Sequence, residues 1–508
     1  MGSYFIQSAA NVGLDAVPVT VEVDVASGLP KFTIVGLPDT AISESRDRVR
    51  AAIKNSDFSF PRTRVTVNLA PADIKKQGPA YDLPIAIGVL AASGFLTGSE
   101  KLRNVVFLGE LALDGRIRPV AGVLLAALMA KSEEMDAIVV CPQNAPEAAL
   151  VKDLIVHPID SLAEFVHLHN NGVEFPVFKS AQQKRTRKQC QEDMANIKGQ
   201  DYAKRALVIA AAGGHNVLLS GPPGAGKTML ARAMPGILPD LAFDEALEIT
   251  KIYSVAGLRN CADALIRERP FRAPHHSSSS VALIGGGTWP KPGEVSLAHR
   301  GVLFLDEFPE FSRSSLENLR QPLEDGIVTI SRAAGTLEFP AQFTLVAAMN
   351  PCPCGNLSDP HKPCVCTPSQ VLKYQHKMSG PLMDRIDLAV EVPRVDFKKL
   401  TDIEQAESSA TIRSTIEQAR ALQRERYTGE GVSMNSELSS RLLRKHCELG
   451  DESLELIKGA MERFQLSARG YTRVLKVSRT IADLAESNCV TSEHVCEALS
   501  YRPQAKQV

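Results

Sequence analysis

The sequence predicts a multidomain α/β protein with an α+β domain first, a core built on a parallel β-sheet second, and an α-helical region last. Three observations carry this prediction. Short apolar runs alternate with helical segments between residues 193 and 395, as in a parallel α/β sheet. Strand-like alternation of apolar and polar residues precedes this block. After about residue 400, apolar residues recur at helical spacing.

We therefore divide the 508 residues into four segments. They are an α+β domain at 1–172, a basic linker at 173–192, the core at 193–395 and a helical domain at 396–508. The linker carries five positive charges from Lys179 to Lys188 and no apolar periodicity. A solvated linker is expected there, and a DNA-contacting basic arm is the alternative.

Individual elements follow from local patterns in chain order. Half-buried strands are predicted at 19–25 and 64–69, and a buried strand at 137–140. Helices are predicted at 126–131 and 146–151. The core strands are 216–220, 302–305 and 343–348. In the helical tail, one apolar face contains Ile412, Ile416 and Ala419, and another contains Val474, Val477, Ile481 and Leu484.

Composition and charge are those of an ordinary globular protein. Apolar residues make up 44% of the chain, charged residues 23%, and the net charge is −1. Any nucleic-acid binding would therefore need a local basic patch. The N-terminus lacks a secretory signal pattern, and the longest apolar run, 83–96, is too short to cross a bilayer. We expect a buried helix there, a cytoplasmic protein and no membrane partner.

The segment from Gly221 to Thr228 reads GPPGAGKT and has the spacing of a phosphate-binding P-loop. An apolar strand precedes it and a helical run follows, so backbone N–H groups and a helix N-terminus would face the phosphates. Lys227 would reach the β- and γ-phosphates of ATP, and Thr228 would bind Mg²⁺. The predicted nucleotide contacts are Gly221, Pro222, Pro223, Gly224, Ala225, Gly226, Lys227, Thr228 and Met229.

The second motif of the nucleotide site is a pair of acidic residues after the strand at 302–305. Asp306 and Glu307 end this strand, at the sheet edge where ligands bind in open α/β folds. Asp306 would hold the Mg²⁺ shell, and Glu307 would act as the general base on the attacking water. The alternative is a surface acid pair at a strand end.

Four of the ten cysteines gather in one short segment, as Cys352, Cys354, Cys364 and Cys366. Four thiolates fit a tetrahedral, structural Zn²⁺ site that leaves no open position for catalysis. His361 is an alternative ligand. Reduced unligated cysteines or a redox pair are the other interpretations.

Several segments together resemble the magnesium-chelatase-like branch of AAA+ ATPases, and specifically the bacterial YifB/ComM family, over essentially the whole chain. The segments that carry the resemblance are 197–200, 271–277, 292–299 and 349–355. The resemblance implies an AAA+ core and an α-helical lid domain. It also implies a hexameric DNA helicase that acts on single-stranded or branched DNA, with recombination proteins as candidate partners. Branch migration in homologous recombination and natural transformation is the implied role.

The resemblance also assigns further nucleotide-site residues. Gly199 and Gln200 would lie at the nucleotide, and Asn350 would sense the γ-phosphate. Arg385 would be an arginine finger acting on a neighbouring subunit, with a local pair to Asp384 or Asp387 as the alternative. Arg469 would be the second sensor, with Arg473 as a competitor one helical turn later.

Two elements of that family project into the pore of the ring. Here they would be an insert at 282–295 with Lys291 and a hairpin at 328–339 with Arg332. A basic side chain on such an element can follow a phosphate backbone. Plain solvent exposure or pairing between subunits is the alternative for both residues.

The N-terminal domain resembles the Lon protease domain, which has the ribosomal S5 domain 2-like fold. The segment 109–122 and Gln77-Gly78-Pro79 carry this resemblance. The position of the catalytic serine falls on Ala80, and that of the lysine falls near Leu124. Neither side chain supplies a nucleophile or a base, so we expect a non-proteolytic domain.

Two other functions stay open. The chain could be a protein-remodelling ATPase, or the motor subunit of a chelatase that inserts Mg²⁺ into a porphyrin. Stimulation of ATP hydrolysis by DNA, by unfolded protein or by protoporphyrin distinguishes the three.

Overall fold

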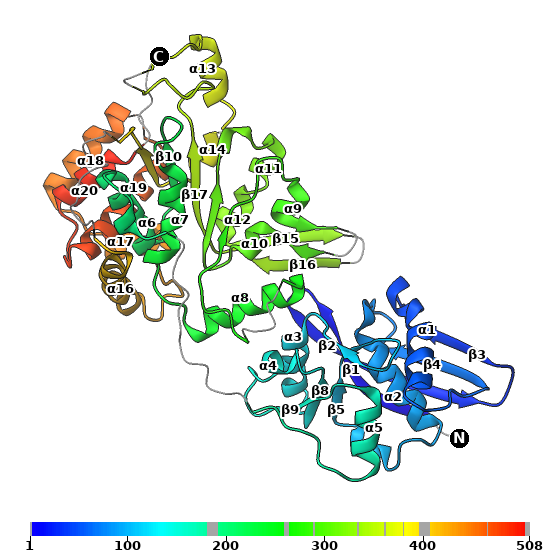
Figure 1. Cartoon of the computed structure of the whole chain (residues 1–508). Coiled ribbons are helices and arrows are strands. Elements are labelled where there is room, and N and C mark those ends of the chain that lie inside the picture. The colour runs from blue at the N-terminus through cyan, green and yellow to red at the C-terminus, as the bar shows by residue number, and fades with distance from the viewer. Residues whose placement is uncertain are drawn as a thin grey trace. The chain divides into compact units, whose positions relative to one another are not determined.

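A computed structural model of the chain describes residues 3–179, 192–258, 264–287, 290–332, 335–359, 362–378, 380–395, 407–464 and 466–502. The chain divides into two compact units (Figure 1). The first contains residues 1–185 and 246–266, and the second contains residues 186–245 and 267–508. Most of the basic linker and the alternative ligand His361 lie outside the described residues.

The first unit is built on a seven-stranded mixed sheet with the order β3-β4-β2-β1-β5-β8-β9. Its central strands β1, β2 and β4 are antiparallel neighbours, and the outer pairs are parallel. The strands are β1 (Tyr4–Val12), β2 (Asp15–Ala26), β3 (Lys31–Val35), β4 (Arg64–Ala70), β5 (Val105–Phe107), β8 (Ala137–Val140) and β9 (Ile155–Pro158). The strands predicted at 19–25, 64–69 and 137–140 are confirmed by β2, β4 and β8.

Helices cover this sheet because their apolar faces need burial. They are α1 (Thr40–Asn55), α2 (Asp82–Ala92), α3 (Val123–Ser132), α4 (Ala145–Ala148) and α5 (Leu162–Asn170). Helix α2 is the predicted buried helix, and every residue from Asp82 to Ala91 is buried. The helix predicted at 146–151 is shorter than expected, because α4 ends at Ala148.

The second unit contains a five-stranded sheet with the order β11-β14-β17-β10-β18. All neighbours are parallel, as predicted for the core. The strands are β10 (Val217–Ser220), β11 (Phe271–Arg272), β14 (Val302–Leu305), β17 (Thr344–Met349) and β18 (Leu388–Glu391). Because β17 lies between β14 and β10, their three carboxyl ends meet at one edge of the sheet.

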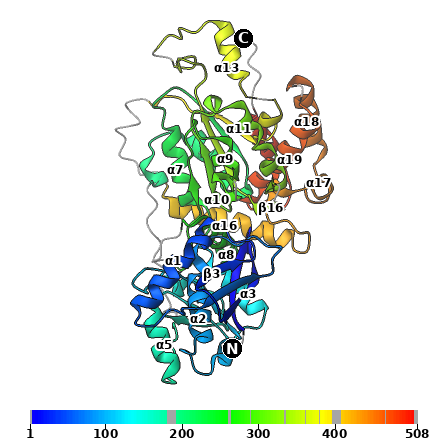
Figure 2. The same ribbon diagram turned by 90° about the vertical axis from the view of Figure 1, so that its right-hand side faces the viewer.

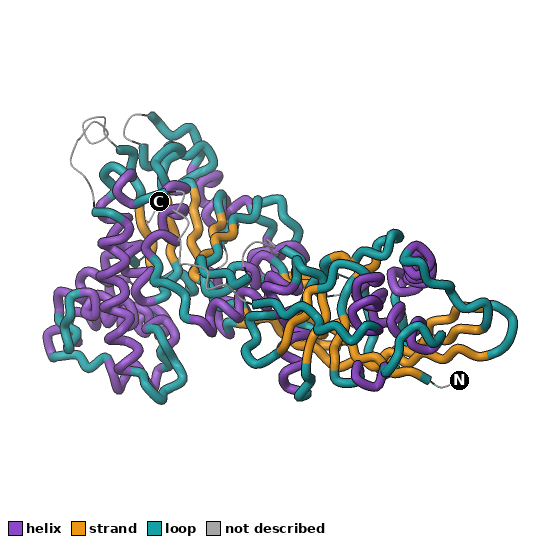
Figure 3. Tube along the Cα trace, turned by 60° about the horizontal axis from the view of Figure 1, so that its bottom comes forward, coloured by secondary structure: helices purple, strands orange, loops and turns teal. Residues whose placement is uncertain are grey.

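The C-terminal region is helical, with helices in purple in Figure 3. Its helices are α16 (Ser409–Arg426), α17 (Ser440–His446), α18 (Asp451–Phe464), α19 (Ala468–Leu484) and α20 (Ser492–Ser500). Both predicted apolar faces pack into the hydrophobic core that also contains β10 and α6 (Asp201–Gly213). Figure 2 shows α17, α18 and α19 gathered beside each other.

Helix α8 (Phe243–Ala256) begins in the second unit, but from Ala246 onward it belongs to the first. Within the first unit, Leu247 packs against the apolar cluster of α3, and the Ser254 hydroxyl donates to the buried Glu147 carboxylate. The division into units therefore differs from a simple cut along the chain. No helix in the described part of the chain is long and apolar enough to span a bilayer.

Candidate nucleotide site

The P-loop connects β10 to helix α7 (Lys227–Ile237) at the carboxyl edge of the core sheet. Gly224 and Gly226 adopt φ angles of 77° and 91°, the left-handed region that favours glycine. Lys227 is 8% exposed. Its Nζ donates to the carbonyls of Gly221 and Pro222 at 2.6 and 2.9 Å. Burial lowers the pKa of Lys227, and nearby Asp306 opposes this shift.

The predicted Mg²⁺ ligands lie side by side. Thr228 Oγ1 donates to Asp306 Oδ2 at 3.1 Å, joining the start of α7 to the end of β14. A hydroxyl and a carboxylate oxygen in contact suit a cation that prefers oxygen ligands. Asn350, which follows β17, accepts from Lys227 Nζ at 3.2 Å. The three core strands therefore bring the four predicted residues to one place.

The predicted base Glu307 has a partner that the sequence did not identify. His276 Nδ1 lies 3.0 Å from Glu307 Oε2. In the sequence His276 belongs to a segment that carries the family resemblance, and no local pattern assigns it a role. What brings His276 to Glu307 is the order of strands in the sheet: β11, which precedes His276, pairs in parallel with β14, which precedes Glu307. Glu307 itself adopts a φ of 50°, which is rare for a residue with a side chain.

Gln200 reaches the P-loop from the start of α6. Its Nε2 donates to the Ala225 carbonyl at 3.2 Å and to the Pro393 carbonyl at 2.6 Å. Gly199 and Gln200 both adopt a φ of 62°, which turns the chain into the helix. Met229 is exposed. The structure thus places Gln200 beside the phosphate-binding loop.

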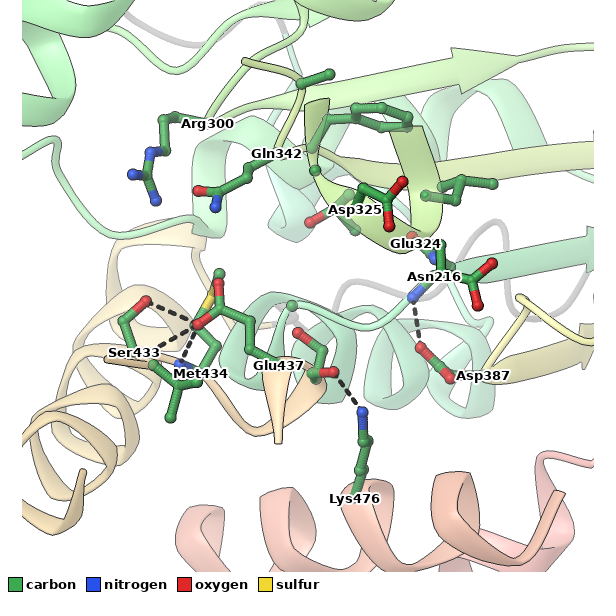
Figure 4. Close-up of a pocket in the computed structure, with 18 of the residues that line it drawn as sticks. Asn216, Arg300, Glu324, Asp325, Gln342, Asp387, Ser433, Met434, Glu437 and Lys476 are labelled. Carbon is green, nitrogen blue, oxygen red and sulfur yellow. Dashed lines mark hydrogen bonds between the residues drawn. The ribbon is translucent and has the colours of Figure 1, made fainter. Parts of the chain in front are cut away.

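The candidate arginines lie elsewhere in the second unit, around a cavity of about 860 Å³. Figure 4 shows this cavity with Glu324, Asp387, Glu437 and Lys476 around it. Arg385 and Arg469 line it, but no residue of the P-loop does. The single chain therefore separates these two arginines from its own phosphate-binding loop.

Glu324 is the acid that the two arginines share. The Arg385 guanidinium pairs with Glu324, and its Nη1 donates to the Pro381 carbonyl at 2.6 Å. Arg469 Nη2 lies 3.9 Å from Glu324. In the described part of the chain neither Asp384 nor Asp387, the expected alternative partners, forms an ion pair with Arg385; Asp387 lies 3.6 Å from Arg473 instead.

The four cysteine sulfur atoms all lie within 4.8 Å of one another. Cys352 Sγ is 3.4 Å from Cys354 Sγ and 3.6 Å from Cys364 Sγ. A tetrahedral Zn²⁺ with bonds of about 2.3 Å separates its sulfur ligands by about 3.8 Å, close to these values. Backbone N–H groups of Asn356 and Val365 lower the pKa of the Cys354 thiol to about 6, which favours its thiolate, whereas desolvation and hydrogen bonds to Cys354 raise the pKa of the Cys364 and Cys366 thiols.

The predicted DNA-contacting residues lie on two small hairpins. Lys291 is exposed and begins β13 (Lys291–Pro292), which pairs with β12 (Gly285–Gly286). Arg332 ends β15 (Ile327–Arg332), which pairs with β16 (Gly335–Pro340). The β15–β16 hairpin extends away from the core sheet in Figure 1.

The positions that match the protease serine and lysine pack in apolar surroundings. Leu124 is fully buried in the cluster around α3, and Ala80 is partly buried against the same cluster. These two positions are close enough to share a cluster, but both carry hydrocarbon side chains.

Comparisons with known proteins agree along the whole chain. Residues 193–400 match the family described as "Magnesium chelatase, subunit ChlI". Residues 21–144 match "Subunit ChlI of Mg-chelatase", and residues 406–502 match "Magnesium chelatase, subunit ChlI C-terminal".

Individual relatives extend the similarity to full length. The chain is 44% identical to "Competence protein ComM" of Haemophilus influenzae over 100% of this chain and 98% of that protein. It is 43% identical to "Uncharacterized protein YifB" of Escherichia coli over 99% of this chain and 97% of that protein. The "Magnesium-chelatase 67 kDa subunit" of Chlorobaculum parvum is 28% identical over 31% of this chain and 23% of that protein. This chain therefore belongs to the YifB/ComM family and carries domains of the magnesium chelatase ChlI type, including the ATPase core.

Proposed function

We propose that this protein is a ring-forming motor that uses ATP hydrolysis to move along DNA, as a helicase or branch-migration factor. The observation that carries the ATPase part is the meeting of Lys227, Thr228, Asp306 and Asn350 at one sheet edge. The DNA part is supported by the full-length similarity to a relative named for competence. A role in homologous recombination and natural transformation follows from that name by analogy alone.

In this proposal each residue of the sheet edge has one task. Thr228 and Asp306 hold Mg²⁺, which neutralises charge that develops on the phosphates. Lys227 contacts the β- and γ-phosphates, and Asn350 senses the γ-phosphate. Glu307 takes the proton from the attacking water. His276 holds the Glu307 carboxylate in position through the 3.0 Å contact.

The positions of the two arginines support the proposed ring. An arginine finger stabilises the transition state by about 10³–10⁵-fold in related phosphoryl transfers, but only where it reaches the γ-phosphate. Arg385 and Arg469 meet Glu324 in a cavity that no P-loop residue lines. We place their target in the nucleotide site of a neighbouring subunit, within a homo-hexamer.

Lys291 and Arg332 are the proposed DNA contacts, since each lies on a hairpin of the core unit. The N-terminal domain, with its Lon-like fold, is proposed to shape the ring or guide DNA without cutting peptides. Ala80 and Leu124 support this view because neither can replace a serine or a lysine. Zn²⁺ at the four cysteines completes the proposed cofactor set.

A strand-displacement and branch-migration assay tests the proposal. Purified protein is mixed with forked or four-way DNA and ATP, beside a Lys227→Ala variant. We expect ATP-dependent products from the parent protein and none from the variant. Stimulation of ATPase activity by unfolded protein or by protoporphyrin, with no DNA effect, would replace the DNA motor by one of the two alternatives.

A further inference from the structure

We infer that the four-cysteine site controls the nucleotide site, because a bound Zn²⁺ would hold the cysteine segment, residues 351–359 and 362–366, against the P-loop and Asn350. The inference rests on the proposed ATPase function and adds a regulatory metal to it. The inference is based on a direct contact between the two sites. A metal that only stabilised its own loop would not require such a contact.

The contact is made by Gly355, directly after the ligand Cys354. A Cβ placed on Gly355 would lie 2.7 Å from Pro223 Cδ in the P-loop and 3.8 Å from Asn350 Cγ. A distance of 2.7 Å is shorter than real Cβ contacts, so no side chain fits between Gly355 and Pro223. The backbone of the cysteine segment therefore packs directly against the P-loop. Gly355 adopts a φ of 80°, and its N–H donates to the Cys352 carbonyl at 3.0 Å. The turn that carries two metal ligands is thus the turn that meets the P-loop.

Both ends of the cysteine segment are also tied to the nucleotide site. At one end, Cys352 follows Asn350 after a single residue, Pro351. At the other end, Thr367 follows Cys366 directly and caps helix α13 (Pro368–Gln375). Helix α13 returns to the first end, where Gln375 Nε2 donates to the Pro351 carbonyl at 3.4 Å and Tyr374 contacts the Asn350 backbone. A movement of the cysteines therefore reaches Asn350 from both sides.

Among the described residues of this segment Cys352 is fully buried, but the other apolar side chains pack little. Val365 is 80% exposed and Leu357 is 47% exposed. Cys354, Cys364 and Cys366 are only partly buried. A segment without a core of its own depends on other links, and metal binding contributes folding free energy directly in such cases. We conclude that the ordered position of Gly355 depends on the metal.

The test removes the metal from the full-length protein. Zinc content is measured before and after treatment with a zinc-selective chelator in the presence of Mg²⁺. Hydrogen exchange is then followed in peptides that cover 217–228 and 344–350, together with kcat and KM for ATP. We expect faster exchange in both segments and a fall in kcat of about 10- to 100-fold, with the fold retained by circular dichroism. Added Zn²⁺ restores both values.

A variant separates the contact from the metal. Gly355→Ala keeps all four cysteines but places a methyl group against Pro223. Gly94→Ala is the matched control, since Gly94 has a φ of 79° and nothing lies within 4 Å of an added Cβ. We expect Gly355→Ala to retain zinc and lower kcat, and Gly94→Ala, with the same backbone strain but no contact, to leave zinc content and kcat unchanged.

The outcomes are distinct. Purified protein that contains no zinc and takes up none would overturn the metal site. Zinc loss that leaves exchange and kcat unchanged would overturn the control of the nucleotide site. If the parent protein does not hydrolyse ATP at all, the proposed function fails, and the exchange of 217–228 with and without zinc still decides the coupling.

Discussion

Each unit of this chain has a turn with a left-handed glycine that leads into a helix, but the two turns deliver different side chains to the start of that helix. In the first unit, Gly78 has a φ of 76° and precedes Ala80 and the buried helix α2. In the second unit, Gly224 and Gly226 precede Lys227 and helix α7. Similar backbone turns therefore lead to different surroundings.

The difference lies in the side chains that the two turns deliver. Ala80 is partly buried against the apolar cluster that contains Leu124. Lys227 instead contacts three oxygen atoms, two from its own loop and one from Asn350. Fold-level resemblance thus says little about chemistry unless the reacting side chains are present.

The strongest test of this comparison is Lys227→Ala. We expect no measurable ATP turnover, because the variant loses the amine that would contact the phosphates. Lys227 is the only buried lysine among the described residues of the second unit. ATP hydrolysis by the purified protein is the measurement. Lys458→Ala, at an exposed position of α18, is the control and should keep full activity. Appreciable turnover by Lys227→Ala would place the chemistry outside the P-loop.

Arg385→Ala should come next, with a loss of about 10³-fold or more in kcat if it is an arginine finger. Arg385 also pairs with Glu324, so circular dichroism must show that the variant folds. Mixing it with the Lys227→Ala variant should restore some activity, because some interfaces would combine an intact P-loop with an intact finger. No recovery on mixing, with both variants in the same ring by light scattering, would argue against action across subunits.

Glu307→Gln should lower kcat by about 10²–10⁴-fold while ATP still binds, because the amide cannot take a proton from water. Binding of a fluorescent ATP analogue and turnover are measured on the same sample. Near-normal turnover would remove Glu307 as the base.

His276→Ala should have a smaller effect, because His276 contacts the base and not the phosphates. We expect a fall of about 10- to 150-fold in kcat with little change in KM, since one hydrogen bond to a charged group contributes about 1.5–3 kcal/mol. His276→Gln, which can still donate to Glu307, should recover part of the loss. His275→Ala is the comparison variant: His275 contacts Ser277 and its ring packs on His276 with centroids 4.1 Å apart, so we expect a loss smaller than that of His276→Ala. Equal losses in the His275 and His276 variants would point to the segment as a whole.

Ala80→Ser should have the smallest effect and tests the other half of the comparison. We expect no peptide cleavage, because Leu124 supplies no base, and ATP turnover equal to that of the parent. A partly buried hydroxyl should lower stability by no more than about 1–3 kcal/mol. Thermal unfolding and a casein-cleavage assay are the measurements. Peptide cleavage by this variant would show that a base exists near Ala80.

Contiguous motifs account for what could be predicted of the site. The P-loop spacing, the acid pair after β14 and the cysteine spacing are local patterns, so each could be read without knowing which strands are neighbours. The core strands β10, β14 and β17 were equally predictable, because their apolar runs are short and bounded, whereas β11 and β18 were not predicted. The alternative partners proposed for Arg385 failed to include Glu324, since Glu324 lies 61 residues away in the sequence.

The sequence by itself determined the ATPase chemistry, because glycine spacing, a P-loop lysine and two acids at a strand end leave few other uses. Only the tertiary structure decided which groups act on one another. The order β11-β14-β17-β10 brings His276 to Glu307 and sets Asn350 beside Lys227. The turn at Gly355 brings the cysteine segment onto Pro223. These contacts join residues far apart in the chain, and no local pattern records them because the order of strands in a sheet is not the order of residues in the sequence.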